Sequence, residues 1–372
     1  VKAARLEVRE RNPVVALQGL FRQILQEGEM DALLVARHLP VKHAVMPALV
    51  TDPEQLDGAD PLAPAFPINA AKVVSRLTRR PSGDRIAAVL RPCEIRAFIE
   101  LVKLKQGSLE DVVLIGTDCP GAYRNLDYKR FSEGGGIEST LRFLQNALND
   151  GNTAIEGFDL SPACKSCELP VAENADITIG LFGINVDEQL LLKANTVKGE
   201  ELLNRLKLPD WEEPRERVDA VAALVAQRTA CRDRMFHDTT EVTNDLEKLM
   251  GYLSNCVNCY NCRVACPVCY CKECVFLTDV FDHEPSQYLR WARKKGVIKM
   301  PTDTVFFHLT RLAHMSTACV GCGQCSNACP NDIPVMELFR TIAHHTQKAF
   351  HYEAGRSVED EPPLSAFREK EF

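Results

Sequence analysis

The amino-acid sequence predicts an α/β domain with a parallel or mixed sheet, followed by a mainly α-helical, cysteine-rich domain. Two observations indicate the α/β domain. Short, continuous apolar runs are typical of strands covered on both faces, and a helical apolar spacing separates two of these runs. The second domain is indicated by cysteine density, because seven of the sixteen cysteines fall within the twenty residues Asn255–Cys274.

The clearest α/β unit is a strand–helix–strand segment. Ile86–Leu90 (IAAVL) and Val112–Ile115 (VVLI) are the two strands, and parallel pairing is the economical arrangement for them. The buried stripe of the intervening helix consists of Ile95, Phe98, Ile99 and Val102, which follow the i, i+3, i+4, i+7 spacing. Asp176–Gly183 alternates like a further strand.

The sequence divides into four segments. Residues 1–207 form the α/β domain, and residues 208–255 form a helical linker that begins in the charged, proline-containing stretch Leu208–Arg217. Residues 256–345 form the cysteine-rich domain, with helix-like material at Ser286–Lys295 and after Pro334. Residues 346–372 are expected to be a mobile tail or a partner-binding arm.

Composition excludes several classes of protein. The 372 residues allow two or three domains, and 45% apolar with 26% charged residues is typical of globular chains. A net charge of −7 without a basic block argues against nucleic-acid binding. No run approaches the roughly 18 apolar residues of a membrane span, and the first residues lack the apolar centre of a signal peptide. We therefore expect a cytoplasmic protein, in which sixteen cysteines indicate metal rather than disulfides.

Two cysteine runs share the spacing C-x2-C-x2-C-x3-C-P, the bacterial ferredoxin signature of [4Fe–4S] clusters. The first run comprises Cys256, Cys259, Cys262 and Cys266, and the second comprises Cys319, Cys322, Cys325 and Cys329. The fourth cysteine of each run normally ligates the other cluster. One cluster is thus predicted to take Cys256, Cys259, Cys262 and Cys329, and the other Cys319, Cys322, Cys325 and Cys266.

Two alternatives fit these runs poorly. Zinc sites use paired C-x2-C knuckles and usually leave no third cysteine at the same interval, and cysteines three apart on one loop would need disulfide partners elsewhere. Residues 267–318 between the runs are too many for the compact ferredoxin sandwich. The region resembles the α-helical ferredoxin domain of succinate dehydrogenase iron–sulfur subunits and of heterodisulfide reductase, as does CPNDIPVMELFR (Cys329–Arg340).

Four dispersed cysteines indicate a third site. Cys93 and Cys119 each follow a predicted strand, at the carboxyl edge where open α/β sheets bind their ligands. Cys164 and Cys167 form a C-x2-C pair. Together the four thiols could hold a cluster. Taken singly, each cysteine could be a small buried hydrophobe, and the pair could be half of a zinc site.

Three motifs carry a family resemblance: RPCEIRA (Arg91–Ala97), IGTDCPG (Ile115–Gly121) and CKSCELPVAENADITIG (Cys164–Gly180). In order and interval they resemble the beta subunits of coenzyme F420-reducing hydrogenase and F420-linked formate dehydrogenase, over about residues 15–180. Members of that family bind FAD beside a [4Fe–4S] cluster and pass electrons between a two-electron carrier and one-electron clusters. Arg91, where the family often has threonine, and Glu168 depart from the pattern.

The resemblance implies a third cluster on Cys93, Cys119, Cys164 and Cys167. It also implies FAD, near Asp176 and Gly180 of the A-D-I-x-x-G match and near Pro67 and Asn69 of AFPIN. The chain has no G-x-G-x-x-G or Walker loop to support a dinucleotide independently. Gly134–Gly136 is interpreted as a flexible loop rather than a phosphate cradle.

Four cysteines remain unassigned: Cys231, Cys269, Cys271 and Cys274. The tight spacing C-x-C-x2-C of the last three would suit three corners of a fourth cluster, with Cys231 as the fourth ligand. The alternative for Cys231 is a half-buried helix residue. The histidines form no catalytic constellation, and the catalytic residues are unknown.

The sequence therefore predicts an iron–sulfur flavoprotein subunit of an oxidoreductase complex, with three or four [4Fe–4S] clusters and FAD. The expected partners are a formate dehydrogenase or hydrogenase catalytic subunit, a small electron-transfer subunit or heterodisulfide reductase-like subunits. Reduced F420 or NADH is the expected soluble carrier. A flavin-free electron-wiring subunit and a zinc-stabilised binding module are the alternatives.

Overall fold

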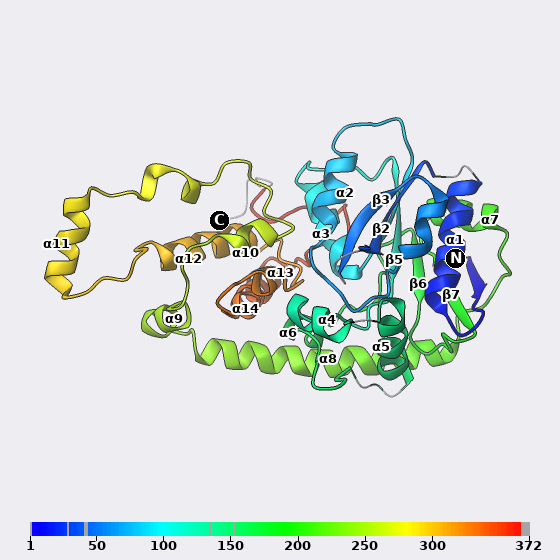
Figure 1. Cartoon of the computed structure of the whole chain (residues 1–372). Coiled ribbons are helices and arrows are strands. Elements are labelled where there is room, and N and C mark those ends of the chain that lie inside the picture. The colour runs from blue at the N-terminus through cyan, green and yellow to red at the C-terminus, as the bar shows by residue number, and fades with distance from the viewer. Residues whose placement is uncertain are drawn as a thin grey trace.

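The computed structural model of the chain describes residues 2–27, 30–40, 44–133, 135–149, 151 and 153–365. Figure 1 shows two lobes side by side: an α/β lobe that contains the N-terminus, and a helical lobe built from residues after about 245. One long helix, α8 (Arg215–Glu241), runs beneath both lobes and connects them. The first of the three glycines Gly134–Gly136 lies outside the described residues, as do residues 366–372 of the C-terminal segment.

The α/β lobe is built on a seven-stranded mixed sheet with the order β1-β7-β6-β5-β4-β2-β3. The four central strands β2, β4, β5 and β6 are parallel, whereas β1, β7 and β3 pair antiparallel at the two edges. The strands are β1 (Ala3–Glu7), β2 (Ala32–His38), β3 (Val45–Val50), β4 (Ile86–Leu90), β5 (Val112–Thr117), β6 (Ile177–Gly180) and β7 (Gln189–Ala194).

Helices cover both faces of this sheet. They are α1 (Pro13–Gln26), η1 (Pro53–Gly58), α2 (Ala71–Thr78), α3 (Pro92–Lys103), α4 (Asn125–Phe131), α5 (Ile137–Asn149), α6 (Pro162–Lys165) and α7 (Val197–Leu206). Phe21 of α1 and Phe143 of α5 belong to one core, whereas Val74 of α2 and Phe98 of α3 belong to another. The second core continues into the helical lobe and includes Phe307 and Phe339, so apolar packing joins the lobes.

The sequence prediction of the strand–helix–strand unit is confirmed. Ile86–Leu90 is β4, the second run begins β5, and the two strands are parallel in the register Ile86–Val112 to Leu90–Gly116. The predicted apolar stripe falls on α3. The strand expected within Asp176–Gly183 is β6, which pairs parallel with β5.

The helical lobe contains short helices joined by long loops. After α8 they are α9 (Leu246–Tyr252), α10 (Asn261–Ala265), η2 (Val275–Leu277), η3 (Asp279–Phe281), α11 (Pro285–Lys295), α12 (Thr304–Met315), α13 (Gln324–Asn327) and α14 (Val335–Ala349). Among the described residues, none of the helices combines the length and apolar character that a bilayer crossing requires.

The segment predicted as a helical linker is anchored to the sheet by a buried ion pair. Arg217 at the start of α8 donates to both carboxylate oxygens of Asp118, at 3.0 Å for the Nη2–Oδ1 pair. The same carboxylate accepts from the backbone N–H of Leu181 at 2.8 Å. Because both charged groups are almost fully buried, each depends on the other for compensation.

We expect Arg217→Met to lower the free energy of unfolding by about 3–5 kcal/mol, because it leaves the Asp118 carboxylate buried without its partner. Thermal unfolding followed by circular dichroism measures the loss. Arg215→Met, at an exposed position two residues earlier in the same helix, is the control and should change little. Equal losses in both variants would contradict the role given to this pair.

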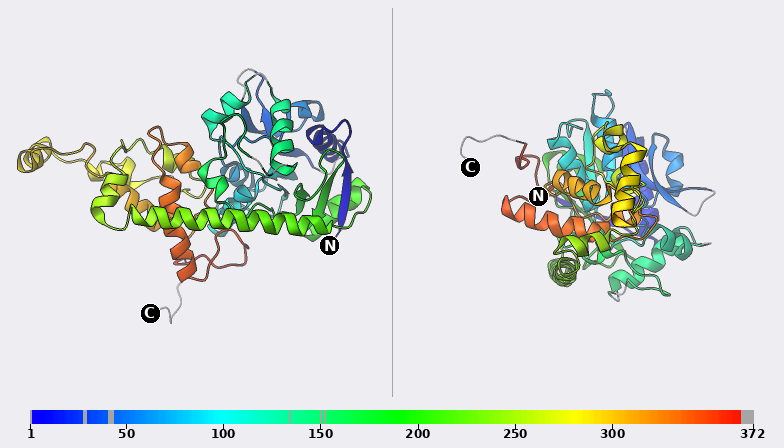
Figure 2. Two further views of the ribbon diagram at one scale, coloured as in Figure 1. Left: turned by 90° about the horizontal axis from the view of Figure 1, so that it is seen from below. Right: turned by 90° about the vertical axis from the view of Figure 1, so that its left-hand side faces the viewer.

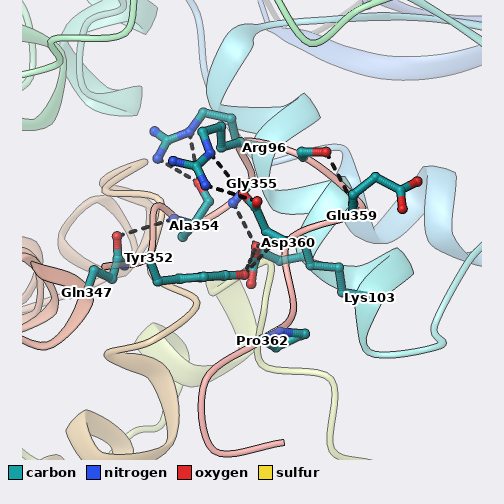
Figure 3. Close-up of polar contacts among 12 residues, drawn as sticks. Arg96, Lys103, Gln347, Tyr352, Ala354, Gly355, Glu359, Asp360 and Pro362 are labelled. Carbon is teal, nitrogen blue, oxygen red and sulfur yellow. Dashed lines mark hydrogen bonds and ion pairs between the residues drawn. The ribbon is translucent and has the colours of Figure 1, made fainter. Parts of the chain in front are cut away.

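The C-terminal segment binds across α3, so the expectation of a mobile tail is wrong for residues 352–360. Figure 3 shows Tyr352, Ala354 and Gly355 lying against Arg96 and Lys103. Tyr352 Oη donates to Glu100 Oε1 at 2.6 Å, and the backbone N–H of Gly355 donates to the same oxygen at 2.7 Å. Arg96 Nη2 donates to the Ala354 carbonyl at 2.7 Å. We call residues 352–360 the strap. It ties the end of the helical lobe to the helix that carries Cys93.

Gly355 is required where the strap passes closest to α3. Its φ is +74°, and a Cβ there would lie 2.4 Å from the Arg96 carbonyl oxygen. We expect Gly355→Ala to release the strap and to accelerate tryptic cleavage after Arg356 at least about tenfold. A loss of about 1.4 kcal/mol in the free energy of local opening raises the open, cleavable population about tenfold. Gly83→Ala is the matched control, since Gly83 has a φ of +83° but nothing within 4 Å of its Cβ position. Unchanged cleavage in Gly355→Ala would contradict this account.

Candidate iron–sulfur centres

The first candidate centre lies at the carboxyl edge of the parallel strands. Cys93 is the second residue of α3, directly after β4, and Cys119 follows β5. With Cys164 and Cys167, at the end of α6, they line one cavity. Short strand-to-helix connections thus bring together the four cysteines that the sequence selected, although they lie up to 74 residues apart (167 − 93). Their role as cluster ligands remains a prediction.

A half-buried arginine lines this first cavity. Arg91 lines it and donates from Nη1 to Cys119 Sγ at 3.5 Å, while Nη2 donates to the Ala65 carbonyl at 2.8 Å. Burial alone would lower the pKa of Arg91, but Cys119 and Glu94 raise it, so the guanidinium stays charged. The residue that departs from the family pattern therefore supplies a fixed positive charge beside the thiols.

The second candidate centre lies in the loop before α13. Cys266, Cys319, Cys322 and Cys325 line one cavity, which is the set that the ferredoxin spacing predicts. Gly321 and Gly323 turn the loop with φ of +69° and +80°. A Cβ on Gly323 would lie 2.4 Å from Cβ of Ala163 in α6, so this loop packs directly on the first centre. Burial raises the pKa of Cys325 well above its usual range.

The third candidate centre lies within the helical lobe, between the loop after α9 and the helix α12. Cys256, Cys259, Cys262 and Cys329 line its cavity, again the set that the crossed ferredoxin pattern predicts. Cys256 and Cys262 are buried, whereas Cys259 is exposed. His308 Nε2 lies 3.4 Å from Cys256 Sγ, and burial lowers the pKa of this histidine to about 4, so its imidazole is neutral at neutral pH.

The three cavities form a continuous series. Cys322 lines both the first and the second cavity, and together with burial and Glu94 it raises the pKa of Cys93. Arg311 links the second and third: it lines the second cavity and donates from Nη1 to Cys262 Sγ at 3.1 Å. The series runs from the sheet edge to the exposed Cys259.

The chemistry of the donor sets fits [4Fe–4S] clusters. Each cavity offers four thiols and at least one buried arginine beside it, as an anionic iron–sulfur group requires. Within the described part of the chain, no three His, Cys, Asp or Glu side chains converge as they would around a single ion. A cubane binds each thiolate through a different iron, so its ligands stand farther apart than zinc ligands at about 2.3 Å from one metal.

Glu168, the second departure from the family pattern, joins the lobes. Its carboxylate pairs with Arg340 of α14 and accepts from Arg232 of α8 at 3.1 Å. Burial opposes ionisation, but Arg340 and Arg232 lower the pKa of Glu168 overall. Arg340 also donates to the Ser166 carbonyl at 2.7 Å, inside the C-x2-C loop. The position after the C-x2-C pair is therefore a structural contact.

The four residues predicted to lie near FAD are Pro67, Asn69, Asp176 and Gly180. Asp176 lies at the amino end of β6, opposite the cysteine edge, and accepts from the Leu114 N–H at 2.8 Å and Thr196 Oγ1 at 2.6 Å. Gly180 faces Arg217, 3.1 Å from its Cβ position. Asn69 donates weakly to the Cys93 carbonyl at 3.5 Å. Pro67 follows Phe66, whose carbonyl accepts from Gln324 at 2.8 Å. A role of these four residues in binding FAD stays a prediction.

The four leftover cysteines do not converge in the structure. Cys231 of α8 lines a cavity with Arg228 and Lys165 in the α/β lobe. Cys269 lies beside Cys266 and Lys72, and Cys271 is exposed. A fourth cluster on these cysteines remains a prediction.

The cavity beside Cys231 has a volume of about 530 Å³. Apolar side chains such as Leu160, Phe182 and Leu224 line it together with Lys165 and Arg228. Arg228 also lines the first cysteine cavity and donates to the Pro120 carbonyl at 2.7 Å. A molecule bound here would therefore be separated from the first candidate centre by little more than this arginine.

Sequence reasoning missed the buried arginines. Arg311, Arg340 and Arg228 approach the cysteine loops from α12, α14 and α8. No spacing rule marks them, because an arginine on a helix is usually a solvated surface residue. Only their position next to buried thiols shows the role. The fold and these centres define the chain as an iron–sulfur protein of the electron-transfer class.

Comparison with known proteins shows which iron–sulfur proteins this chain resembles. Residues 83–210 match the family model for the C terminus of the coenzyme F420 hydrogenase/dehydrogenase beta subunit, and residues 252–333 match the 4Fe-4S dicluster domain. The chain is 25% identical to the F420-dependent formate dehydrogenase subunit beta of Methanocaldococcus jannaschii over 88% of each chain. It is 24% identical to the F420-dependent formate dehydrogenase 1 subunit beta of Methanococcus maripaludis, over 94% of this chain and 92% of the relative.

Over most of its length the chain is thus similar to beta subunits of F420-dependent formate dehydrogenases, which are subunits of oxidoreductases, and residues 83–210 match the beta-subunit family model. A chain in the solved F420-reducing [NiFe] hydrogenase complex of Methanosarcina barkeri is also similar, at 15% identity and a TM-score of 0.45. That similarity covers 66% of this chain and 94% of the other.

The ligand sets predict the iron content. Three centres should give about twelve irons per chain, and four centres about sixteen. We expect Cys322→Ala to lower the content by about four irons, since Cys322 lines the second cavity. Iron and acid-labile sulfide are determined on anaerobically purified protein. Cys231→Ala and Cys271→Ala are the controls and should leave the iron content unchanged. Loss of about four irons in a control would instead support a fourth centre.

Proposed function

We propose that the chain is an electron-relay subunit that connects a two-electron donor with one-electron acceptors. The observation that carries the proposal is the series of three four-cysteine cavities, joined through Cys322 and Arg311. When bound, [4Fe–4S] clusters exchange single electrons, and FAD converts between two-electron and one-electron transfers. Only the last centre, through Cys259, has an exposed cysteine among these twelve, so it is the proposed surface terminal.

The residues of the chain supply position and charge. Arg91 and Arg311 are held within reach of Cys119 and Cys262, where fixed positive charge favours the anionic form of a bound cluster. The Glu168–Arg340 pair and the strap hold the first and second centres in one arrangement. Cys93, Cys319 and Cys325 are partly buried, which limits the access of water to the interior of the relay.

We place FAD in the cavity of about 530 Å³ rather than at Pro67, Asn69, Asp176 and Gly180. Its volume falls in the range of about 300–1,000 Å³ that is typical of small-molecule sites. Its wall combines apolar side chains, which suit a flavin ring, with polar ones; Arg228 provides positive charge for an anionic group, and Lys165 pairs with Asp159. The shared Arg228 sets the cavity directly beside the first centre.

The donor and the partners are inferred from the relatives. The two curated relatives are named F420-dependent formate dehydrogenase beta subunits, which supports reduced F420, or formate through a catalytic subunit, as the donor. NADH remains the alternative carrier. The α-helical dicluster domain supports delivery to a heterodisulfide reductase-like complex. A reducing compartment such as the cytoplasm suits cysteines that form no disulfide among the described residues.

The decisive experiment measures flavin together with iron. We expect anaerobically purified chain to release about one FAD per chain on acid denaturation, because the cavity holds one small molecule. Leu224→Trp, which would fill the cavity from α8, should remove FAD and leave iron unchanged, whereas Val218→Trp at an exposed site of α8 should change neither. Protein replete in iron but without FAD would favour the flavin-free wiring subunit. Optical reduction by F420, NADH, or formate with a partner subunit then identifies the donor.

A further inference from the structure

An arm projects from the helical lobe without packing on the rest of the molecule. Figures 1 and 2 show α11 standing apart at the end of the lobe in views turned by 90°. None of the eleven residues of α11 is buried. A helix of this length is marginal in water and normally depends on packing for its stability. The arm therefore lacks the contact that such a helix requires.

The arm is strongly basic. Residues 285–301 contain five basic residues and no acidic residue, in a chain whose net charge is −7. Arg290, Arg293, Lys294 and Lys295 are exposed, and none of them forms an ion pair with another described residue. We call residues 285–301 the basic arm. Unpaired positive charge concentrated on one projecting element favours an acidic surface as its contact.

Exposed apolar side chains accompany these charges. Leu289 of α11 is 55% exposed, and Val297 and Met300 in the returning segment are 77% and 57% exposed. An apolar centre with a charged surround is the usual composition of a protein–protein interface.

The root of the basic arm lies at the third candidate centre. Lys299 Nζ donates to Thr304 Oγ1 at 3.2 Å and to the Leu253 carbonyl, next to the loop of Cys256, at 3.4 Å. Asn258, inside that loop, donates to Asp303 Oδ1 at 3.0 Å. The exposed Cys259 follows directly. A protein bound to the arm would thus lie over the part of the relay that reaches the surface.

We propose that the basic arm docks an acidic protein that carries its own one-electron iron–sulfur centre, beside Cys259. This proposal rests on the relay function and names the partner of its surface terminal. In each encounter one electron passes between the two proteins, so that one is oxidised and the other reduced by one electron, without proton transfer. The arm itself supplies attraction and orientation, which in charged electron-transfer pairs act mainly on association.

The test uses full-length chain with its clusters and an acidic two-[4Fe–4S] bacterial ferredoxin as the probe. Binding is measured by calorimetric titration at low ionic strength. We expect an affinity that falls with added salt, and that falls at least about tenfold when Lys294→Glu and Lys295→Glu are combined. The matched control combines Lys129→Glu and Arg130→Glu on the exposed surface of α4. It makes the same change in net charge on the α/β lobe and should bind as the unaltered chain does.

Several results would overturn the docking proposal: no binding of the ferredoxin, equal loss in the arm and control variants, or equal binding of a basic c-type cytochrome. Arm-dependent binding to vesicles of anionic lipid, in preference to ferredoxin, would overturn the docking proposal and indicate a membrane as the partner. Arm-dependent self-association would overturn it and indicate a second copy of this chain as the partner. Failure of the relay function is read separately. A chain that contains no iron, or iron that dithionite does not reduce, would contradict the proposed relay function, whether or not the ferredoxin binds.

Discussion

The arrangement of this molecule depends on placing clustered thiol groups in its interior with positive charge beside them. Twelve cysteines line three cavities, and most of them are partly or fully buried. Buried negative charge is tolerated only when it is paired. Arg91 and Arg311 donate to thiols, whereas Arg228 and Arg340 donate to backbone carbonyls of the cysteine loops, so these contacts also hold four different elements together.

The interface between the lobes follows from the same constraint. The loop of Cys319–Cys325 must approach the sheet edge closely, and glycine at position 323 lets its backbone pass next to Ala163. Around this apolar contact the polar groups are satisfied across the interface: Gln324 donates to the Phe66 carbonyl, and Arg340 pairs with Glu168. The strap adds a further contact between the lobes, because the backbone N–H of Gly355 donates to Glu100 of α3. Two cavities that share Cys322 are thereby held as one unit rather than as separate domains joined by a linker.

The need to pair buried charge also explains the two departures from the family pattern. Arg91 and Glu168 look anomalous when each is compared with its counterpart in a motif. In the structure both are charged groups whose partners come from distant segments: Arg91 reaches Cys119, and Glu168 reaches Arg232 and Arg340. Asp176 and Gly180, which match the motif, contact the backbone of β5 and the side chain of Arg217, respectively.

The sequence by itself determined the local elements and the grouping of twelve cysteines. Buried strands and the α3 stripe follow from apolar periodicity, and the two ferredoxin sets follow from spacing, because both are properties of short segments. The buried arginines, the bound strap, the separation of Cys231 from Cys269 and the cavity beside Arg228 were decided only by the tertiary structure. Each of these features depends on contacts between segments that are distant in the sequence. The energies of burial and of charge pairing determine those contacts, and the residue pattern of one segment alone does not predict them.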